Sequence, residues 1–257
     1  MFSFFKKKKG PEPQIIPTYH VADLSFLGGD MHSHLVPGID DGSQSLEDSV
    51  HFIRSLREMG IRDFITTPHI HGEMYDNDTT KVQRTFGPLH EHLKLHHPDM
   101  RIQTSAEYFL DSYFLSDVLP KGLMPFGDNQ VLVEVSMAGW NRQFNEIIFA
   151  VQANGYKPIL AHPERYIYET DIQVFENLKN KGVSLQLNLL SIIGYYGRSI
   201  KINADKMLEA GLYDYCGTDL HHQRHLDRIR MLPTEHQETL WRLSEYGFRN
   251  RELFRHL

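Results

Sequence analysis

The sequence contains very little cysteine and no long hydrophobic run. Cys216 is the single cysteine among 257 residues, and one thiol cannot form an internal disulfide, a cysteine-rich zinc site or an iron–sulfur cluster. This scarcity favours a cytoplasmic protein, because reducing compartments keep thiols free. No apolar stretch approaches the roughly 18 residues that cross a bilayer. The opening segment places its lysines after its apolar residues, which does not match a secretory signal.

An excess of basic residues is also missing. The chain has 27 lysines and arginines against 33 acidic residues, a formal net charge of −6, which argues against a nucleic-acid partner. Lysines at 6–9, followed by a proline-rich stretch, predict a flexible basic tail and linker over residues 1–20. We expect at most peripheral contact between this tail and an anionic membrane surface. Residues 21–257 are expected to form one domain with a sizeable core, since 40% of the chain is hydrophobic.

The remaining sequence alternates short apolar runs with amphipathic stretches, as in repeated βα units. A first strand is expected at 26–32 and a first helix at 46–59, where apolar residues recur at helical spacing up to Gly60. Further strands are expected at 61–67, 101–107, 131–135, 158–161, 183–187 and 213–217, and further helices at 77–97, 111–119, 142–154, 172–181, 200–210 and from about 234. Seven such repeats favour an α/β fold with a single closed or nearly closed barrel, although a doubly wound open sheet remains an alternative.

Histidine is abundant, with 16 residues in the chain, and it is the commonest metal ligand in proteins. Imidazoles and carboxylates follow the ends of most predicted strands. These side chains belong to His32, His34, Asp40, Asp41, His69, His71, Glu107, Glu134, His162, Asp219, His221 and His222. Because the carboxyl ends of parallel barrel strands meet on one face, we expect these groups to form a metal site there.

The type and number of these candidate ligands indicate which metals could bind. His32 and His34 alternate with one residue between them, so both imidazoles would lie on the same side of a strand and could hold one ion. The set is nitrogen and oxygen without thiolate, which suits Mn²⁺, Fe or Zn²⁺. The ligands outnumber what one ion takes, so two or three ions are implied, with Glu107 as the best bridge between a pair. Paired ions of this kind are typical of phosphoester hydrolases.

Several short motifs resemble the PHP-superfamily protein-tyrosine phosphatases of bacterial capsule and exopolysaccharide loci, the CpsB/CapC-like enzymes. The first motif is DMHSHLVPGIDDG at 30–42, and the others follow in the family's order as TPH at 67–69, AEY at 106–108, LVE at 132–134, AHPERY at 161–166 and GTDLH at 217–221. The first motif and the AHPERY string are the specific ones. The resemblance runs from about residue 23 to 231.

This resemblance implies a distorted seven-stranded βα barrel (the PHP fold) with a trinuclear site, usually manganese-dependent. It implies three ligand sets, namely His32, His34, Glu107 and Asp219 for the first ion, Glu107, Glu134 and His162 for the second, and Asp41, His69 and His221 for the third. It also implies Arg165 and Arg224 as phosphate contacts. His222 doubles the last histidine of the pattern, so either His221 or His222 could be the ligand.

The function implied is hydrolysis of phosphotyrosine on a protein by metal-activated hydroxide, with Arg165 binding the phosphoryl oxygens. The resemblance points to an exopolysaccharide or capsule tyrosine kinase with a tyrosine-rich tail as the partner. Phenolate, with a pKa near 10, leaves readily, so a strong general acid is not required. Asp40 and His222 are the candidates for such an acid.

Three alternatives differ in class. A cysteine-based phosphatase would need an arginine six residues after Cys216, where His222 stands instead. A histidinol-phosphate phosphatase or another small-molecule phosphoesterase would use the same metals and remains open. A metal-stabilised binding module without catalysis would be expected to have lost ligands, whereas every expected position is occupied here.

Overall fold

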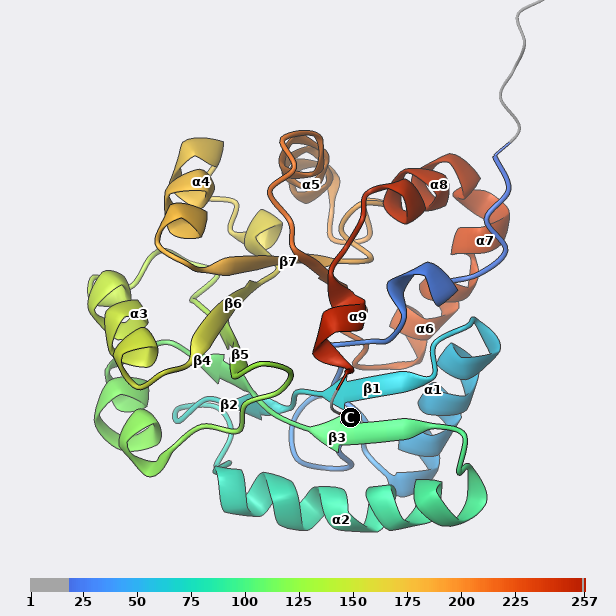
Figure 1. Cartoon of the computed structure of the whole chain (residues 1–257), viewed down its shortest axis with the longest axis horizontal. Coiled ribbons are helices and arrows are strands. Elements are labelled where there is room, and N and C mark those ends of the chain that lie inside the picture. The colour runs from blue at the N-terminus through green and yellow to red at the C-terminus, as the bar shows by residue number, and fades with distance from the viewer. Residues whose placement is uncertain (1–18, 256) are drawn as a thin grey trace, which may run out of the picture.

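The computed structural model describes residues 19–255 and 257, and it shows helices arranged around a centre of parallel strands (Figure 1). The strands are β1 (Asp63–Thr66), β2 (His69–Ile70), β3 (Arg101–Thr104), β4 (Glu107–Phe109), β5 (Gln130–Glu134), β6 (Lys157–Ala161), β7 (Ser184–Asn188) and β8 (Tyr215–Gly217). They pair in parallel throughout, as a two-stranded sheet β1-β3 and a six-stranded sheet β2-β4-β5-β6-β7-β8. The predicted α/β class with parallel pairing is confirmed.

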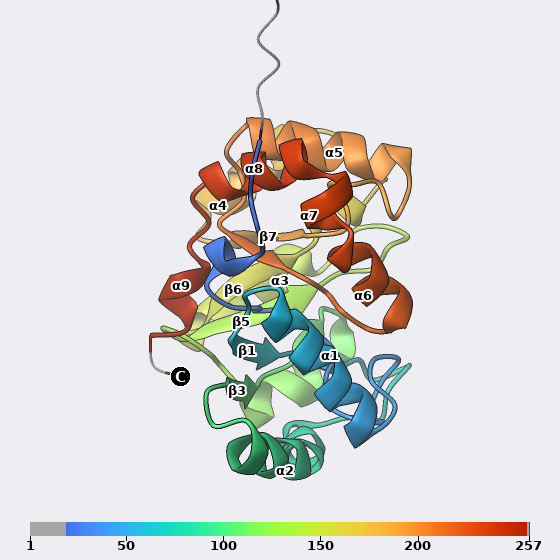
Figure 2. The same ribbon diagram turned by 90° about the vertical axis from the view of Figure 1, so that its right-hand side faces the viewer.

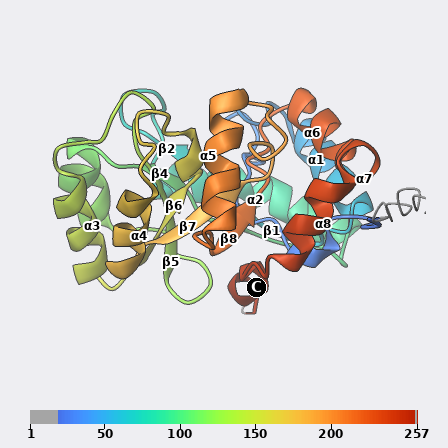
Figure 3. The same ribbon diagram turned by 90° about the horizontal axis from the view of Figure 1, so that it is seen from above.

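The helices lie outside the strands, as Figures 1 and 3 show from two directions. They are α1 (Leu46–Glu58), α2 (Thr79–His96), α3 (Phe144–Ala153), α4 (Ile172–Asn180), α5 (Arg198–Glu209), α6 (Gln223–Arg230), α7 (Leu232–Glu235), α8 (Gln237–Glu245) and α9 (Asn250–Leu253). The first helix begins where expected because Ser45 accepts a hydrogen bond from the Asp48 amide as its N-cap. It ends before Gly60, whose φ of +93° a glycine adopts without strain. No helix among the described residues is long and apolar enough to cross a membrane.

The predicted first strand at 26–32 is wrong. Residues Ser25–Leu27 form a 3₁₀ turn, and the chain that follows makes only two isolated bridges, Asp30 with Phe64 and Ser33 with Leu220. Gly28 has a φ of +79°, which interrupts an extended strand. A Cβ at Gly29 would lie 2.5 Å from the Phe254 ring, so the backbone passes too close to α9 for a regular strand with side chains.

Three other predicted elements are divided, shortened or changed. The expected strand at 101–107 is split into β3 and β4. The expected strand at 61–67 ends at Thr66. Pro68 follows shortly after and has no N–H group to donate to a neighbouring strand. The expected helix at 111–119 is a short π-helical turn at Phe114–Val118 followed by a 3₁₀ turn. The charged helix α6 was not expected.

The strand centre is filled by apolar side chains and closed at its base by α9. Met31, Ile65, Leu132 and Ile159 are buried together with Leu253 of this last helix and with Phe254, which directly follows it. The Asn250 side chain donates to the carbonyls of Gly29 and Cys216 and accepts from the Cys216 amide. The last helix thus bonds both to β8 and to the segment that precedes β1 in the chain. Figure 2 shows α9 at one edge of the molecule, with the strands to one side of it.

The expected tail and linker at residues 1–20 lie outside the described residues except for the last two. The Tyr19 ring packs on Trp241 of α8, with 5.0 Å between ring centroids.

Candidate metal centre

A cavity of about 450 Å³ lies at the carboxyl-end side of the strands. It is lined by all the expected ligands except His32 and His34, which are fully buried. His69 begins β2, Glu107 begins β4, Glu134 ends β5, and His162 follows β6 directly. All nine predicted ligands lie within contact of another member of the set. These residues are His32, His34, Asp41, His69, Glu107, Glu134, His162, Asp219 and His221. Their roles as ligands stay predictions, but their meeting in one place does not depend on any metal.

The innermost group consists of His32, His34, Glu107 and Asp219, all buried. His32 Nε2 lies 3.3 Å from Glu107 Oε2 and 3.2 Å from Asp219 Oδ1. The corresponding distances from His34 Nε2 are 3.4 and 3.5 Å. Ligand atoms bonded at about 2.0–2.2 Å to one ion are separated by roughly 3.0–3.6 Å. The spacing therefore fits four ligands around a single divalent cation, and it is the set that the family resemblance implied for the first ion.

Two further groups adjoin the innermost one. His69 Nδ1 lies 3.1 Å from Glu134 Oε1 and 3.2 Å from Glu107 Oε2, and His162 Nε2 lies 3.0 Å from Glu107 Oε1. Glu107 therefore reaches the innermost group and His69 through Oε2, and His162 through Oε1. His69, Glu107 and Glu134 form one potential ligand group, and His162 adjoins it only through Glu107. His69 stands in this group through Nδ1, whereas the sequence placed it only in the third set.

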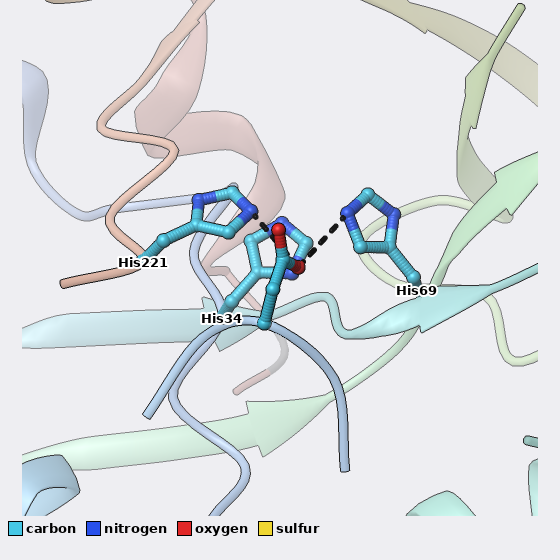
Figure 4. A group of neighbouring side chains, drawn as sticks. His34, His69 and His221 are labelled. Atoms are coloured by element: carbon cyan, nitrogen blue, oxygen red, sulfur yellow. Dashed lines mark ion pairs between the residues drawn. The ribbon is translucent and has the colours of Figure 1, made fainter. Parts of the chain in front are cut away.

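The third group joins three imidazoles from separate segments with one carboxylate. His34, His69 and His221 face one another in Figure 4, and Asp41 Oδ1 lies 3.7 Å from Nε2 of both His69 and His221. His221 is the member of the doubled histidine pair that reaches this group. His222 is exposed and is the N-cap of α6, where its side chain accepts from the His225 amide.

Unsatisfied atoms at the floor test whether a cation fits there. His69 Nδ1, Glu107 Oε2 and Asp219 Oδ1 are buried without a hydrogen-bond partner. Buried polar atoms are normally hydrogen-bonded, and each one left unpaired is destabilising. These three atoms face the shared interior of the ligand groups, so divalent cations would satisfy all of them. The residues present therefore fit the metals that the sequence predicts.

The electrostatics of the inner group point the same way. Burial opposes the charged form of His32, but the carboxylates of Glu107 and Asp219 outweigh it and raise the pKa of His32 to about 10. Burial likewise opposes ionisation of Glu107 and Asp219, yet the neighbouring imidazoles, His32 first, hold both carboxyl pKa values well below their usual range. The group thus requires positive charge next to its carboxylates. A divalent cation would supply that charge and leave the imidazoles neutral as ligands.

Two side chains behind the inner group orient its imidazoles. His32 Nδ1 donates to Gln186 Oε1 at 3.0 Å, and His34 Nδ1 donates to Asp40 Oδ2 at 2.8 Å. Each bond leaves Nε2 directed at the carboxylates, the arrangement that holds metal-binding histidines in place. Gln186 Oε1 also accepts from the His162 amide at 3.2 Å. The sequence pointed to no role for Gln186, because an uncharged side chain within an apolar strand carries no distinctive pattern.

Asp40 was expected as a candidate general acid, and its position favours a different role. It is buried behind His34 and also accepts from the amides of Gly42 and His69. Burial would raise the pKa of Asp40, but the charge and hydrogen bond of His34 hold it below its usual range. These contacts favour Asp40 as a residue that positions His34, and its role as a general acid stays a prediction.

Two of the predicted ligands have backbone conformations that side chains rarely adopt. His162 has a φ of +35° and Asp219 a φ of +51°. Such left-handed residues are strained by the order of 1–3 kcal/mol and persist only where the surroundings hold them. The Gln186 bond to the His162 amide and the 2.8 Å bond from the Asp219 amide to the His32 carbonyl provide this support.

The two predicted phosphate contacts differ in position. Arg165 lines the cavity, donates through Nη1 to Asp219 Oδ2 at 2.9 Å and lies 4.4 Å from the Tyr196 ring centroid. Arg224 is exposed on α6 and does not line the cavity. His225 is a cavity residue that sequence reasoning missed; it is buried, and its Nδ1 lies 3.1 Å from the Asp219 carbonyl oxygen.

Comparison with known proteins gives consistent results. Residues 29–232 match the model of the family described as "Capsular polysaccharide synthesis, CpsB/CapC". The tyrosine-protein phosphatase YwqE of Bacillus subtilis is 27% identical over 195 residues, covering 75% of this chain and 76% of the relative. The tyrosine-protein phosphatase CpsB of Streptococcus pneumoniae is 27% identical over 199 residues, covering 75% and 82%.

A solved structure shares the fold. It comes from crystallographic work on YwqE from Bacillus subtilis and CpsB from Streptococcus pneumoniae, described as unique metal-dependent tyrosine phosphatases. The match has a TM-score of 0.67 at 24% identity and covers 86% of this chain and 94% of the other.

Proposed function

Because the chain belongs to the CpsB/CapC family, as the match over residues 29–232 shows, we propose that it is a metal-dependent protein-tyrosine phosphatase. The observation that carries the proposal is the meeting of three groups of potential ligands in one cavity with the Arg165 guanidinium beside them. The relatives named as tyrosine-protein phosphatases support the same activity.

The site would hold two or three divalent ions, with Mn²⁺ as the first choice and Fe or Zn²⁺ as alternatives for this nitrogen and oxygen donor set. The shared members His34, His69 and Glu107 link the three ligand groups, which supports more than one ion. When bound, such ions would lower the pKa of water toward neutrality and offset the charge of the phosphoryl oxygens.

The chain's own residues would bind and orient the substrate. One Nη1 bond to Asp219 fixes the Arg165 guanidinium, whose other N–H groups remain to bind phosphoryl oxygens. Stacking on Tyr196 restricts the same guanidinium from the side. His222 lines the cavity and is a candidate for protonating the leaving phenolate.

Several finer statements accompany this proposal. We propose that residues 21–257 form one domain whose two sheets belong to a distorted (βα)₇ barrel. Backbone bonds support it, because Asp30 and Ser33 bond to the β1 region while His32 and His34 bond to residues 219–220 after β8. We also propose a cytoplasmic location, from the single buried cysteine, and a capsule or exopolysaccharide tyrosine kinase as the protein dephosphorylated, from family membership.

A side-by-side assay tests the function. Purified protein with Mn²⁺ should release phosphate from a phosphotyrosine peptide and should release little from histidinol phosphate. Glu107→Gln should lose this activity, because the neutral amide removes the contact shared by two ligand groups. Exclusive turnover of histidinol phosphate would contradict the proposed substrate. Stable metal binding without any phosphate release would favour a binding module instead.

A further inference from the structure

The walls of the cavity differ in chemistry on their two sides. Polar and cationic side chains, Arg165, Tyr196 and His222 among them, come from the chain after β6, β7 and β8. Apolar side chains come from the chain at or after β2, β4 and β5, the neighbouring strands at the other end of the six-stranded order. The side built on β2, β4 and β5 thus carries apolar residues next to the expected ligands His69, Glu107 and Glu134. Met74 and Met137 lie outside every family motif.

The apolar side includes two methionines that the fold leaves exposed. Met74 has 67% of its surface exposed and Met137 has 41%. Among the described residues eight large apolar side chains are exposed, and these two are the ones that line the cavity. A methionine is flexible, and its sulfur packs favourably against aromatic rings. Two exposed methionines at the mouth thus offer an adaptable surface to an aromatic group.

Phe109 lines the same cavity as these two methionines. It stands two residues beyond Glu107 on β4, so the two side chains lie on the same side of the strand, with Phe109 nearer the mouth. The His71 ring packs on the Phe109 ring with 3.9 Å between centroids. Phe109 is therefore an aromatic wall residue on the strand that also carries the expected ligand Glu107.

The segment that carries Met74 is anchored at both ends. Its start is a turn in which the Met74 and Tyr75 amides donate to the His71 carbonyl at 3.1 and 2.9 Å. Its end is held by Asn77, whose side chain donates to the Ile39 and His69 carbonyls. The Tyr75 ring stacks on His69 at 5.3 Å. Met74 is therefore presented from a fixed backbone.

We propose that Phe109, Met74 and Met137 form a slot for the aromatic ring of the substrate, and that this slot selects aryl over alkyl phosphomonoesters. The inference rests on the proposed function, which places the phosphoryl group at the floor. A different explanation needs no slot, since phenolate is a better leaving group than an alkoxide and would favour aryl esters by itself. Binding of compounds without a leaving group separates the two explanations.

The experiment measures the affinity of Mn²⁺-loaded protein for benzylphosphonate and for ethylphosphonate by titration calorimetry. Both ligands carry the same anionic group, neither is hydrolysed, and only the first has a ring. The unaltered protein should bind benzylphosphonate roughly 10-fold more tightly. In the double variant Met74→Ala/Met137→Ala this preference should fall by about 5-fold, because two sulfur–ring contacts are lost, while ethylphosphonate binding stays unchanged.

Controls make the result specific. Both methionines are exposed, so their replacement leaves the core intact, and Phe149→Ala, an exposed position on α3 outside the cavity, should keep the ring preference. Phe109→Leu should reduce the preference as well. Equal loss of affinity for both phosphonates, no preference in the unaltered protein, or no binding of either would overturn the slot. A ring preference without any phosphate release from a phosphotyrosine peptide would instead sustain the slot and refute the proposed phosphatase activity.

Discussion

Asp40→Asn should weaken Mn²⁺ binding although Asp40 does not face the ligand groups' interior. Its Oδ2 accepts from His34 Nδ1 and from the His69 amide, and its Oδ1 accepts from the Gly42 amide. An asparagine has only one acceptor oxygen at this place. If that oxygen takes the place of Oδ1 and keeps the Gly42 amide bond, the new NH₂ group faces His34 Nδ1 and the His69 amide. It then favours the His34 tautomer with hydrogen on Nε2. That nitrogen could then no longer bind a cation.

The expected magnitude follows from comparable carboxylate–histidine pairs at metal sites. Removing such a partner lowers metal affinity by about 10- to 100-fold, equivalent to roughly 1.4–2.7 kcal/mol. Titration calorimetry with Mn²⁺ measures the change. Thermal unfolding of the metal-free protein checks that the variant folds, because the substitution preserves side-chain volume.

A matched control is Asp227→Asn, which removes an exposed carboxylate of α6 that does not line the cavity. It should leave Mn²⁺ affinity unchanged. An Asp40→Asn variant that folds normally and binds Mn²⁺ within 2-fold of the unaltered protein would refute the positioning role. Such a result would also reopen Asp40 as an acid.

Three other perturbations have defined outcomes. Arg165→Ala should lower kcat/KM for a phosphotyrosine peptide by roughly 10- to 100-fold, because a charged hydrogen bond is lost, and should keep the metal content found by elemental analysis. Arg224→Ala should leave kcat/KM within about 2-fold. An unchanged kcat/KM in Arg165→Ala would exclude the phosphate contact. Chelation of the Mn²⁺-loaded protein should lower Tm by about 5–10 °C, since ligand at 100 times its Kd stabilises by ~2.7 kcal/mol, and Mn²⁺ should restore it; an unchanged Tm would contradict a loaded site. Burial raises the pKa of the Cys216 thiol well above its usual range. From about pH 8.5 upward, therefore, only the unfolded state loses the thiol proton. The free energy of unfolding should then fall by up to ~1.4 kcal/mol per pH unit. Denaturant unfolding between pH 8 and 9.5 should show this slope relative to Cys216→Ala, and equal slopes would place the thiol outside the core.

Most of the site could be predicted because its residues come directly at the ends of predicted strands. Glu134 and His162 follow apolar runs that periodicity identifies as strands, and parallel pairing then brings their side chains to one face. The same reasoning could not separate Arg165 from Arg224. Both arginines follow a histidine-containing motif, but Arg224 lies within α6. The charged sequence of α6 lacks the apolar pattern that would have predicted where this helix begins.

The parts that sequence reasoning missed depend on long-range contacts. The first predicted strand has enough apolar residues, yet Gly28 and Gly29 and the close approach of Phe254 prevent a regular ladder. Gln186 acquires its role only because His32 and His162, 154 and 24 residues away in the chain, converge on its amide oxygen. No local sequence pattern predicts these contacts of Gln186.

The closed base formed by α9 has a practical consequence for handling the protein. Leu257 lies at that base, where its carbonyl accepts from Arg101 at the start of β3, whereas Phe109 and Met137 line the opposite, open end. A resin, sensor chip or fluorescent label coupled through the carboxyl-terminal side would therefore stand away from the mouth. The mouth of the cavity would then stay accessible to long peptides on immobilised molecules. Association rates measured on a surface would therefore reflect peptide entry into the cavity rather than steric obstruction by the support.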